Sequence, residues 1–417
     1  MKKWIRFGIG LLCFHSLTAH AELTWSGFLT AAGAASNVRY MNTGVEPLYM
    51  EHIGKQINFE KDSVLGIELN KEFDEVVGVT GRIVAAGRRD WDVKATRAFI
   101  KYSPAEKWHW KLGRVPTDYL IHSEDVFESY QYHWIALPES VYDMIPFHYL
   151  DGINTGFKMQ LFKRNLKVKA ALGALSEHTR TPVSDIEHTY KLRQVVHLMG
   201  SYGNEVFKLQ GSYSVGRLTW GPNLTNESVN VFINSLINNA VLGQDYQNYL
   251  TVDNERILYQ AIGYSFNWKK VVSYAEYLRR KSSAAIIPNL NAWYIMLGVR
   301  HQNLVPYVTV ARQRISDNET RRFPGTANMA ALMPIPGGLG NTLDNTVQAI
   351  AEGIDGPAAG DQTSYTAGVR WNVIDAVSVK ASIEHIHPDR RSTGLFNVHP
   401  HKSVNIYRVG VDATFSE

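Results

Sequence analysis

The sequence predicts an all-β fold, an antiparallel barrel of about 16 strands that crosses a membrane. Three observations predict it. Apolar and polar side chains alternate through many segments of roughly ten residues. The connections between these segments are alternately short and long. After residue 21 there is no run of about 18 apolar residues, which excludes a bundle of membrane-spanning helices.

The first 21 residues have the composition of a signal peptide. Lys2, Lys3 and Arg6 precede an apolar run over 7–17, and small residues ending at Ala21 close it. The run is too short to span ~30 Å of hydrocarbon. We therefore expect a cleaved signal peptide over 1–21 and an exported mature chain over 22–417.

Charge and cysteine content exclude several classes of protein. The predicted signal peptide holds three of the 43 basic residues and none of the 39 acidic ones, so the mature chain is nearly neutral and lacks the basic excess of a nucleic-acid-binding protein. The single cysteine, Cys13, lies within 1–21. We expect no disulfide, no thiolate metal site and no lipid anchor.

The strands are predicted from period-two alternation. The clearest segments are Ser63–Asn70, Asn154–Leu161, Val206–Val215, Tyr365–Trp371, Val377–Glu384 and Tyr407–Phe415. Two other segments, Arg256–Phe266 and Val271–Arg280, do not separate into an apolar and a polar face. Their orientation stays open.

The connections support a membrane barrel more strongly than the strands do. Short turns are expected at Phe73–Val76, Ser103–Glu106, Lys163–Asn165, Gly203–Asn204, Trp268–Lys270, Gln302–Leu304 and Asn372–Asp375. Long loops are expected at Asn37–Lys61, Val115–Leu150, Ser176–Leu192, Arg217–Asp253, Ser282–Leu290, Ile315–Gln362 and His387–Lys402, with a compact one at Arg89–Asp92. Short periplasmic turns and long extracellular loops are typical of bacterial outer-membrane barrels. A soluble β-sandwich is the alternative, but it gives no reason for this regularity.

Aromatic residues near strand ends are consistent with two membrane interfaces. They are Trp25, Trp108, Trp110, Trp268, Trp293, Trp371 and Phe415.

If the apolar parity faces lipid, the polar parity faces the lumen, because a charge facing lipid near the midplane costs a few kcal/mol. The basic residues of that parity are Arg82, Arg88, Arg97, Lys101, Lys111, Lys158, Lys167, Lys169, Arg193, Lys208, Arg300, Arg370, Lys380 and Arg408. The acidic ones are chiefly Glu68, Glu384 and Asp412. The lumen is therefore predicted to be basic.

The long loop over 115–150 differs from the others in composition. It contains no lysine or arginine, but has several acids, among them Asp118, Glu124, Asp125 and Glu128, and many aromatic residues. Such a loop would expose much apolar surface to water unless it packed against something. We expect it to lie inside the barrel.

In this arrangement the chain resembles the Gram-negative outer-membrane porin superfamily, of the 16-stranded diffusion type. The resemblance rests on the strand Trp108–Val115 followed directly by that loop, on the opening strand Trp25–Leu29 and on the closing strand Val409–Phe415. The chain departs from the family in that Ser416 and Glu417 follow the last aromatic residue, and the Pro-Glu-Phe-Gly-Gly loop tip of some general porins is missing.

The resemblance implies a constriction loop over 115–150 whose acids face a basic wall across a narrow aqueous gap. The predicted pore-lining residues are Arg82, Arg97, Lys101, Lys111, Lys158, Arg370 and Arg408 on the wall and Asp118, Glu124, Asp125 and Glu128 on the loop. The implied function is passive diffusion of ions and small hydrophilic solutes through the outer membrane. We also predict a weak preference for anions, because the wall bases outnumber the lumenal acids, with selectivity near neutral as the alternative. The implied partners are the lipid bilayer, lipopolysaccharide, the solutes themselves and two further copies in a homotrimer.

Two alternatives stay open. One is a substrate-specific channel with the same fold. The other is a plugged barrel whose loops act as a surface or adhesion protein. A folded barrel without conductance would distinguish the plugged form, and block by one class of solute would distinguish the specific channel.

Neither catalysis nor a cofactor is predicted. The sequence has no serine elbow, P-loop, dinucleotide fingerprint or zincin helix, so we expect no enzyme. His385, His387, His399 and His401 cluster around the last long loop. Paired histidines of this spacing can bind a transition metal, but they more often belong to a polar rim, and no metal site is assigned.

Overall fold

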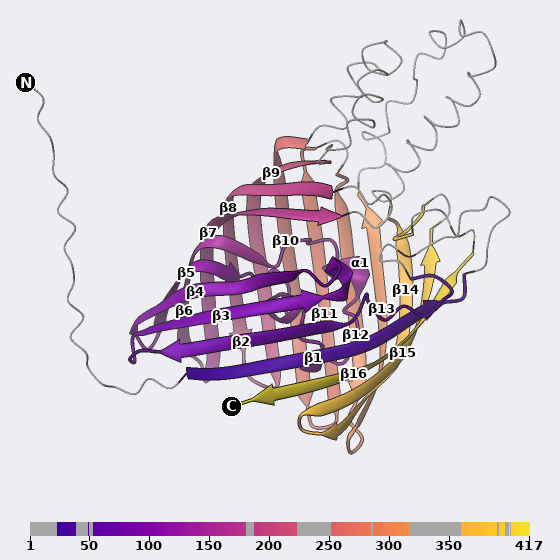
Figure 1. Ribbon diagram of the computed structural model, residues 1–417, viewed down its shortest axis with the longest axis horizontal. Coiled ribbons are helices and arrows are strands. Elements are labelled where there is room, and N and C mark those ends of the chain that lie inside the picture. Colours follow the sequence, from indigo (N-terminus) through magenta and orange to yellow (C-terminus); the bar gives the residue numbers. More distant parts are fainter. Residues whose placement is uncertain are drawn as a thin grey trace, which may run out of the picture.

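In the computed structural model the strands close into a single barrel (Figure 1). The structure describes residues 23–38, 49, 53–180, 187–222, 252–284, 287–316, 360–389, 392–396, 400 and 402–417. The predicted signal peptide over 1–21 lies outside the described residues. Within them, no helix is long and apolar enough to span a membrane.

Each strand pairs antiparallel with its neighbours in sequence, and β1 pairs with β16 to close the ring. The strands are β1 (Leu23–Ser36), β2 (Val64–Glu72), β3 (Val77–Ala86), β4 (Val93–Ala105), β5 (Trp108–Pro116), β6 (Tyr149–Leu161), β7 (Arg164–Arg180), β8 (Glu187–Gly203), β9 (Phe207–Pro222), β10 (Val252–Trp268), β11 (Val271–Ser282), β12 (Leu290–Val299), β13 (Leu304–Ile315), β14 (Gln362–Ile374), β15 (Val377–Pro388) and β16 (Val404–Ser416). The predicted 16-stranded antiparallel barrel is confirmed.

Short and long connections alternate around the ring as predicted, with two main differences in extent. β9 continues to Pro222, past the expected start of a loop at Arg217. A loop was expected over 176–192, but β7 continues to Arg180 and β8 begins at Glu187. The two strands stay paired from Ser176–Lys191 outward to Arg180–Glu187. Backbone pairing therefore extends past the point where the side-chain alternation fades, since the ladder does not depend on an apolar face.

Alternation places apolar side chains on the outside of the wall. On β2, Leu65, Ile67 and Leu69 are exposed, whereas Glu68 and Asn70, which have the other parity, point inward. Five of the predicted interface aromatics, Trp108, Trp110, Trp268, Trp371 and Phe415, are exposed and lie near the short-turn end of their strands. An outer apolar band with aromatic residues at its edge suits a bilayer.

A bulge reverses the face of one predicted lumenal residue. The register of β8 against β9 shifts between Arg193 and Val196. Leu192 and Val195 are both buried in the interior cluster, so Arg193 lies on the outer face. The prediction of Arg193 as lumenal was wrong, because one extra residue in a strand inverts the parity of everything before it.

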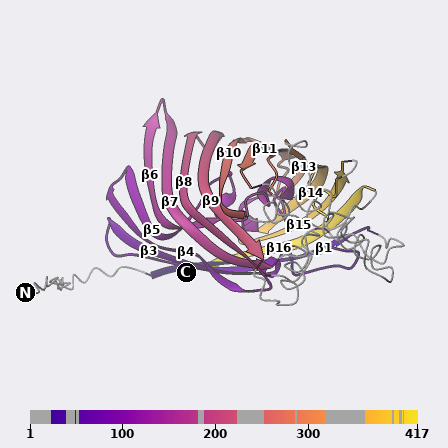
Figure 2. The same cartoon turned by 90° about the horizontal axis from the view of Figure 1, so that it is seen from above.

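The segment between β5 and β6 lies inside the ring of strands (Figure 2). It contains two single 3-10 turns, η2 (Ser123–Asp125) and η3 (Ser129–Gln131), and one short helix, α1 (Glu139–Tyr142), which contacts β12 and β13. Most of its aromatic residues form one buried cluster with the inner face of the wall, and Phe127 and Tyr130 pack in a second, smaller cluster with Phe28. We call residues 117–148 the inward loop.

Candidate functional site: the inward loop and the basic wall

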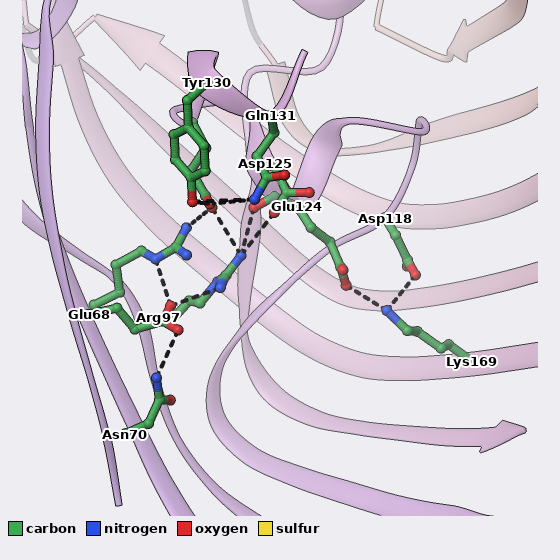
Figure 3. A network of polar contacts seen from close by, with 11 residues as sticks. Glu68, Asn70, Arg97, Asp118, Glu124, Asp125, Tyr130, Gln131 and Lys169 are labelled. Atoms are coloured by element: carbon green, nitrogen blue, oxygen red, sulfur yellow. Dashed lines mark hydrogen bonds and ion pairs between the residues drawn. The ribbon is translucent and has the colours of Figure 1, made fainter. Parts of the chain in front are cut away.

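The first contact between loop and wall centres on two arginines of adjacent strands. Arg82 of β3 and Arg97 of β4 are cross-strand neighbours. Both donate to Oε2 of Glu68 on β2, at 2.7 and 2.8 Å. Arg82 also binds the loop carboxylate of Glu128. Arg97 donates to the backbone oxygen of Glu124 at 3.0 Å (Figure 3).

Glu68 and Glu128 thus hold two like charges side by side from opposite directions. Two guanidinium groups on neighbouring strands repel each other, and a carboxylate on each side offsets this repulsion. Arg97 reaches a third carboxylate, that of Asp125, at 3.4 Å. The loop acids are therefore part of the electrostatic balance of the wall.

The second contact lies on β7 and β8. Nζ of Lys169 lies 2.8 Å from Asp118 and 2.5 Å from Glu124, both on the inward loop (Figure 3). The other oxygen of Asp118 lies 2.9 Å from Nε2 of His197. Lys169, Asp118 and His197 are all buried. A buried lysine and carboxylate in direct contact fix the position of the start of the loop.

Two of the loop acids, Asp118 and Asp125, differ in protonation. Burial alone would raise the pKa of Asp118, but Lys169 and His197 outweigh it and hold that pKa well below its ordinary value. Burial raises the pKa of Asp125 to about 6, and the neighbouring Glu128 adds to the rise, while Arg97 opposes it. Asp118 is thus charged at all physiological pH values, and Asp125 titrates near neutrality.

The third contact holds the helical end of the loop. Glu139 of α1 binds Lys61, from the segment before β2, and lies 3.1 Å from Nη2 of Arg408 on β16. Arg408 also binds Glu384 at 2.7 Å and Asp62 at 3.3 Å. All five side chains are buried. Arg408 therefore joins the segment before β2, the inward loop and the wall.

Backbone carbonyls of the loop accept hydrogen bonds from two further wall cations. Nζ of Lys380 on β15 donates to the oxygen of Trp134 at 2.8 Å and contacts Asp412 at 2.9 Å. Nη1 of Arg370 on β14 donates to the oxygen of Tyr132 at 3.0 Å. These bonds fix the loop without using a loop carboxylate.

The remaining side of the loop packs against aromatic residues of β10 to β13. Nε1 of Trp134 donates to Oγ1 of Thr309 at 2.9 Å, and its ring meets Tyr294 edge-on at 5.7 Å. Glu276 of β11 accepts from the hydroxyls of Tyr142 and Tyr294 and from the backbone of Ile121. This part of the wall is rich in aromatic residues, and its polar side chains bond to the loop.

These contacts correct one expectation about the channel. The loop acids were expected to face the basic wall across an aqueous gap. Instead Asp118, Glu124, Asp125 and Glu128 lie within ion-pair distance of Lys169, Arg97 and Arg82. Direct contact is favoured over a water-filled gap because most of these side chains are withdrawn from water. An unpaired charge is costly in such surroundings.

The structure brings Arg82, Arg97, Arg370 and Arg408 to the loop, but not the other predicted wall residues. Lys101 binds Glu72 near the short-turn end. Nζ of Lys111 lies over the ring of Phe99 at 4.6 Å, and Lys158 is exposed opposite Lys167 in the register. Among the described residues, no carboxylate lies within 4 Å of the Lys111 or Lys158 ammonium group.

Several residues that hold the loop were not predicted as site residues. Lys61, Glu139, His197, Glu276 and Trp134 are the chief ones. Lys61 lies in a long loop, where strand parity gives no information. Glu276 lies in one of the two segments whose faces did not separate, and the mixed pattern itself signals a wall covered on its inner side.

The histidines of the last loop do not form a metal site in the described part of the chain. His385 bonds Asn405 at 2.7 Å and His387 bonds Ser403 at 2.9 Å, both on the exposed side of the strands. His399 and His401 lie outside the described residues. Within the part of the chain that the structure describes, no three metal-binding side chains come together.

Comparison with known proteins identifies the fold. No protein-family model and no curated protein matches the sequence. An anion-selective porin from Comamonas acidovorans superposes with a TM-score of 0.55 at 11% identity, covering 95% of this chain and all of that one (100%). OmpF of Salmonella typhi, in complex with daunomycin, gives 0.53 at 10% identity, with 95% and 98% covered. The outer-membrane channel DcaP of Acinetobacter baumannii gives 0.50 at 12%, with 95% and 97% covered. This chain has the 16-stranded fold of those porins.

Proposed function

We propose that the chain is an outer-membrane channel of the porin type through which ions and small hydrophilic solutes diffuse passively, with a weak preference for anions. The observation that carries the proposal is the inward loop bound to a basic wall by Arg82, Arg97 and Lys169. Its acids are thereby neutralised, and the uncompensated charge that remains in the lumen is positive.

The distribution of the remaining charges supports the preference for anions. The wall acids Glu68, Glu384 and Asp412 each contact a wall cation, whereas Glu276 accepts hydrogen bonds from two tyrosine hydroxyls and a backbone N–H. The inward-facing cations for which no carboxylate lies within 4 Å among the described residues are Lys111, Lys158, Lys167, Lys208, Arg300 and Arg370. Most of them lie between the inward loop and the short-turn end of the barrel. Low-dielectric walls strengthen the field of such a cluster, which attracts anions and repels cations.

The reversal potential of the purified, detergent-folded protein in a planar bilayer under a KCl gradient tests this function. Open steps with a potential toward the chloride limit would support both the channel and its basic lumen. A potential toward the potassium limit would contradict the preference for anions. A matched variant, Lys111→Gln with Lys158→Gln, should bring the potential closer to zero.

One observation favours a plugged surface protein as the second candidate. The inward loop contacts strands on both sides of the lumen, from Arg82 on β3 to Thr309 on β13 and Arg408 on β16. If these contacts persist at all times, the barrel would be closed. Protein that is folded, as shown by heat-modifiable migration, but gives no conductance would establish the plugged barrel.

The proposal includes export through the signal peptide over 1–21, residence in the outer membrane, contact with lipopolysaccharide, and assembly into a homotrimer. It includes no catalysis and no cofactor. The similar structures support the location, since they include an anion-selective porin and an outer-membrane channel. A substrate-specific channel has the same fold, and block of conductance by one class of solute would identify it.

A further inference from the structure

Six cations point outward from the long-loop ends of adjacent strands. They are Arg193 on β8, Arg217 on β9, Arg256 on β10, Arg279 and Lys281 on β11, and Arg314 on β13. We call them the outer basic row. Each follows the exposed parity, since the residues next to them in sequence, such as Leu218, Ile257 and Leu278, are buried in the interior cluster.

Three members of the row lie opposite one another in the register, and the described residues give the row no counter-charge. Arg193 pairs with Arg217, and Arg217 pairs with Arg256, so three guanidinium groups lie directly opposite one another. Among the described residues, no carboxylate lies within 4 Å of any of the six cationic groups. The nearby acids Asp253 and Glu255 accept hydrogen bonds from the hydroxyls of Thr219 and Ser283 instead.

Like charges directly opposite one another destabilise a sheet unless an anion lies between them. Across β8 to β13 the row extends over five strand spacings, or roughly 24 Å. One phosphate group is too small to neutralise a row of that width. The row therefore fits an anion that carries more than one phosphate.

The height of the row on the barrel indicates the headgroup layer. Tyr277 is exposed, and Arg279 and Lys281 follow it toward the long-loop end of β11. The first step is two residues, about 7 Å along the strand. A tyrosine at the edge of the apolar band marks the interface, and cations just beyond it lie level with lipid headgroups.

A hollow in the outer wall begins directly below the row. It has a volume of about 450 Å³ and is lined by Tyr213, Gln260, Ile262, Tyr277 and Arg279, together with parts of Ser212 and Ala261. Next to it, the cross-strand pair Gly200 and Gly211 leaves the surface open, because an added Cβ would meet no atom closer than 3.8 Å. Ile262 and the two tyrosine rings give the hollow an apolar part, and with an arginine at its edge it suits an acyl chain attached to a phosphorylated headgroup.

We propose that this face of β8 to β13 binds a lipid with two or more phosphates in its headgroup, of the lipid A type, from the outer leaflet. The outer basic row binds the phosphates, and the hollow between Tyr213 and Tyr277 receives one acyl chain. The inference rests on the outer-membrane location proposed above, but not on conductance.

Native mass spectrometry of the detergent-folded protein, with bis-phosphorylated lipid A added, tests the site. The variant carries Arg193→Gln, Arg217→Gln and Arg256→Gln. Each cation near an anionic lipid surface contributes roughly a factor of five to binding, so we expect affinity to fall about a hundredfold. The matched control, Lys107→Gln with Lys163→Gln and Lys270→Gln, removes the same charge at the short-turn end and should bind as the unaltered protein does.

A further variant distinguishes the acyl-chain part of the site from the phosphate-binding part, and other ligands distinguish lipid A from alternative occupants. Gly211→Trp, which places a large ring on the open surface beside the hollow, should weaken binding of lipid A but not of its phosphorylated, deacylated headgroup. Equal binding of phosphatidylglycerol, of phosphate-free lipid A, or of lipid A by the triple variant would overturn the proposal. Loss of oligomers in the triple variant without loss of lipid would assign the face to a second copy of the chain.

Heat-modifiable migration shows whether each variant folds. Conductance of the triple variant in a planar bilayer should be unchanged, since the row lies outside the lumen. Lipid A binding without conductance would refute the channel alone, and conductance without lipid A binding would refute this site alone.

Discussion

The ammonium group of Lys169, on the barrel wall, lies 2.8 Å from the carboxylate of Asp118, at the start of the inward loop. Both side chains are largely buried, with exposed fractions of 5% and 6%. The same ammonium group reaches Glu124, six residues further along the loop. One wall residue thus fixes both ends of the first turn of the loop, and the position of the loop depends on it.

Replacing Lys169 with methionine should destabilise the folded barrel. The change leaves Asp118 buried without its cation, and removing one member of a buried pair costs about 3–5 kcal/mol. Chemical unfolding in detergent measures the change. Lys158→Met is the matched control, because Lys158 is exposed on the neighbouring strand with no carboxylate within 4 Å among the described residues. Equal losses in the two variants would contradict the role of Lys169.

Replacing Glu128 with glutamine should increase the preference for anions. Glu128 is a buried loop carboxylate that binds Arg82 and lies 3.5 Å from Arg97. Its loss leaves two guanidinium groups with less compensating charge inside the lumen, so chloride is favoured. The reversal potential under a KCl gradient measures this. Glu75→Gln removes the same charge in an exposed turn, and a shift as large in that variant would refute the assignment.

The preference for anions should rise as the pH falls through about 6. Burial and the neighbouring Glu128 raise the pKa of Asp125 to about 6, so this loop carboxylate is charged above that pH and neutral below it. Reversal potentials between about pH 7.5 and about pH 5 measure the change. Asp125→Asn should abolish the change, whereas Asp74→Asn, in an exposed turn, should keep it. A pH response that survives in Asp125→Asn would assign it to another group.

The same carboxyl group has a predictable effect on stability. Its folded-state pKa lies above its ordinary value of 3.8, so the folded chain binds this proton more tightly than the unfolded chain does. The contribution of Asp125 therefore favours folding more as the pH falls from about 6 toward 4, the opposite of a carboxylate whose pKa is lowered by its cation.

Replacing Trp134 with alanine should loosen the apolar side of the inward loop. Its ring is 2% exposed among the aromatic residues of β11 to β13, and truncating a buried aromatic residue costs about 3–5 kcal/mol. Unfolding in detergent and single-channel conductance measure the effects, and conductance should become larger and noisier. Trp371→Ala is the control, because Trp371 is 47% exposed on the outer wall. Unchanged stability in Trp134→Ala would refute the packing role.

The sequence by itself determined the strand number, the alternation of turns and loops, and the segment that enters the barrel. These follow from local patterns. A strand with one face to lipid must alternate, and a loop such as 117–148, rich in aromatic residues and free of lysine and arginine, needs a surface to cover it. Arg82, Arg97 and Arg408 were placed on the inner wall by the same parity.

Only the tertiary structure decided which charges meet. Lys61 and Glu139 are 78 residues apart, and neither lies in a strand, so no period relates them. A bulge before Val196 moved Arg193 to the outer face, and a bulge leaves little trace in residue type. The loop acids touch the wall because the lumen is narrow enough to exclude much of the water between them, and a buried charge is stable only with its partner in contact.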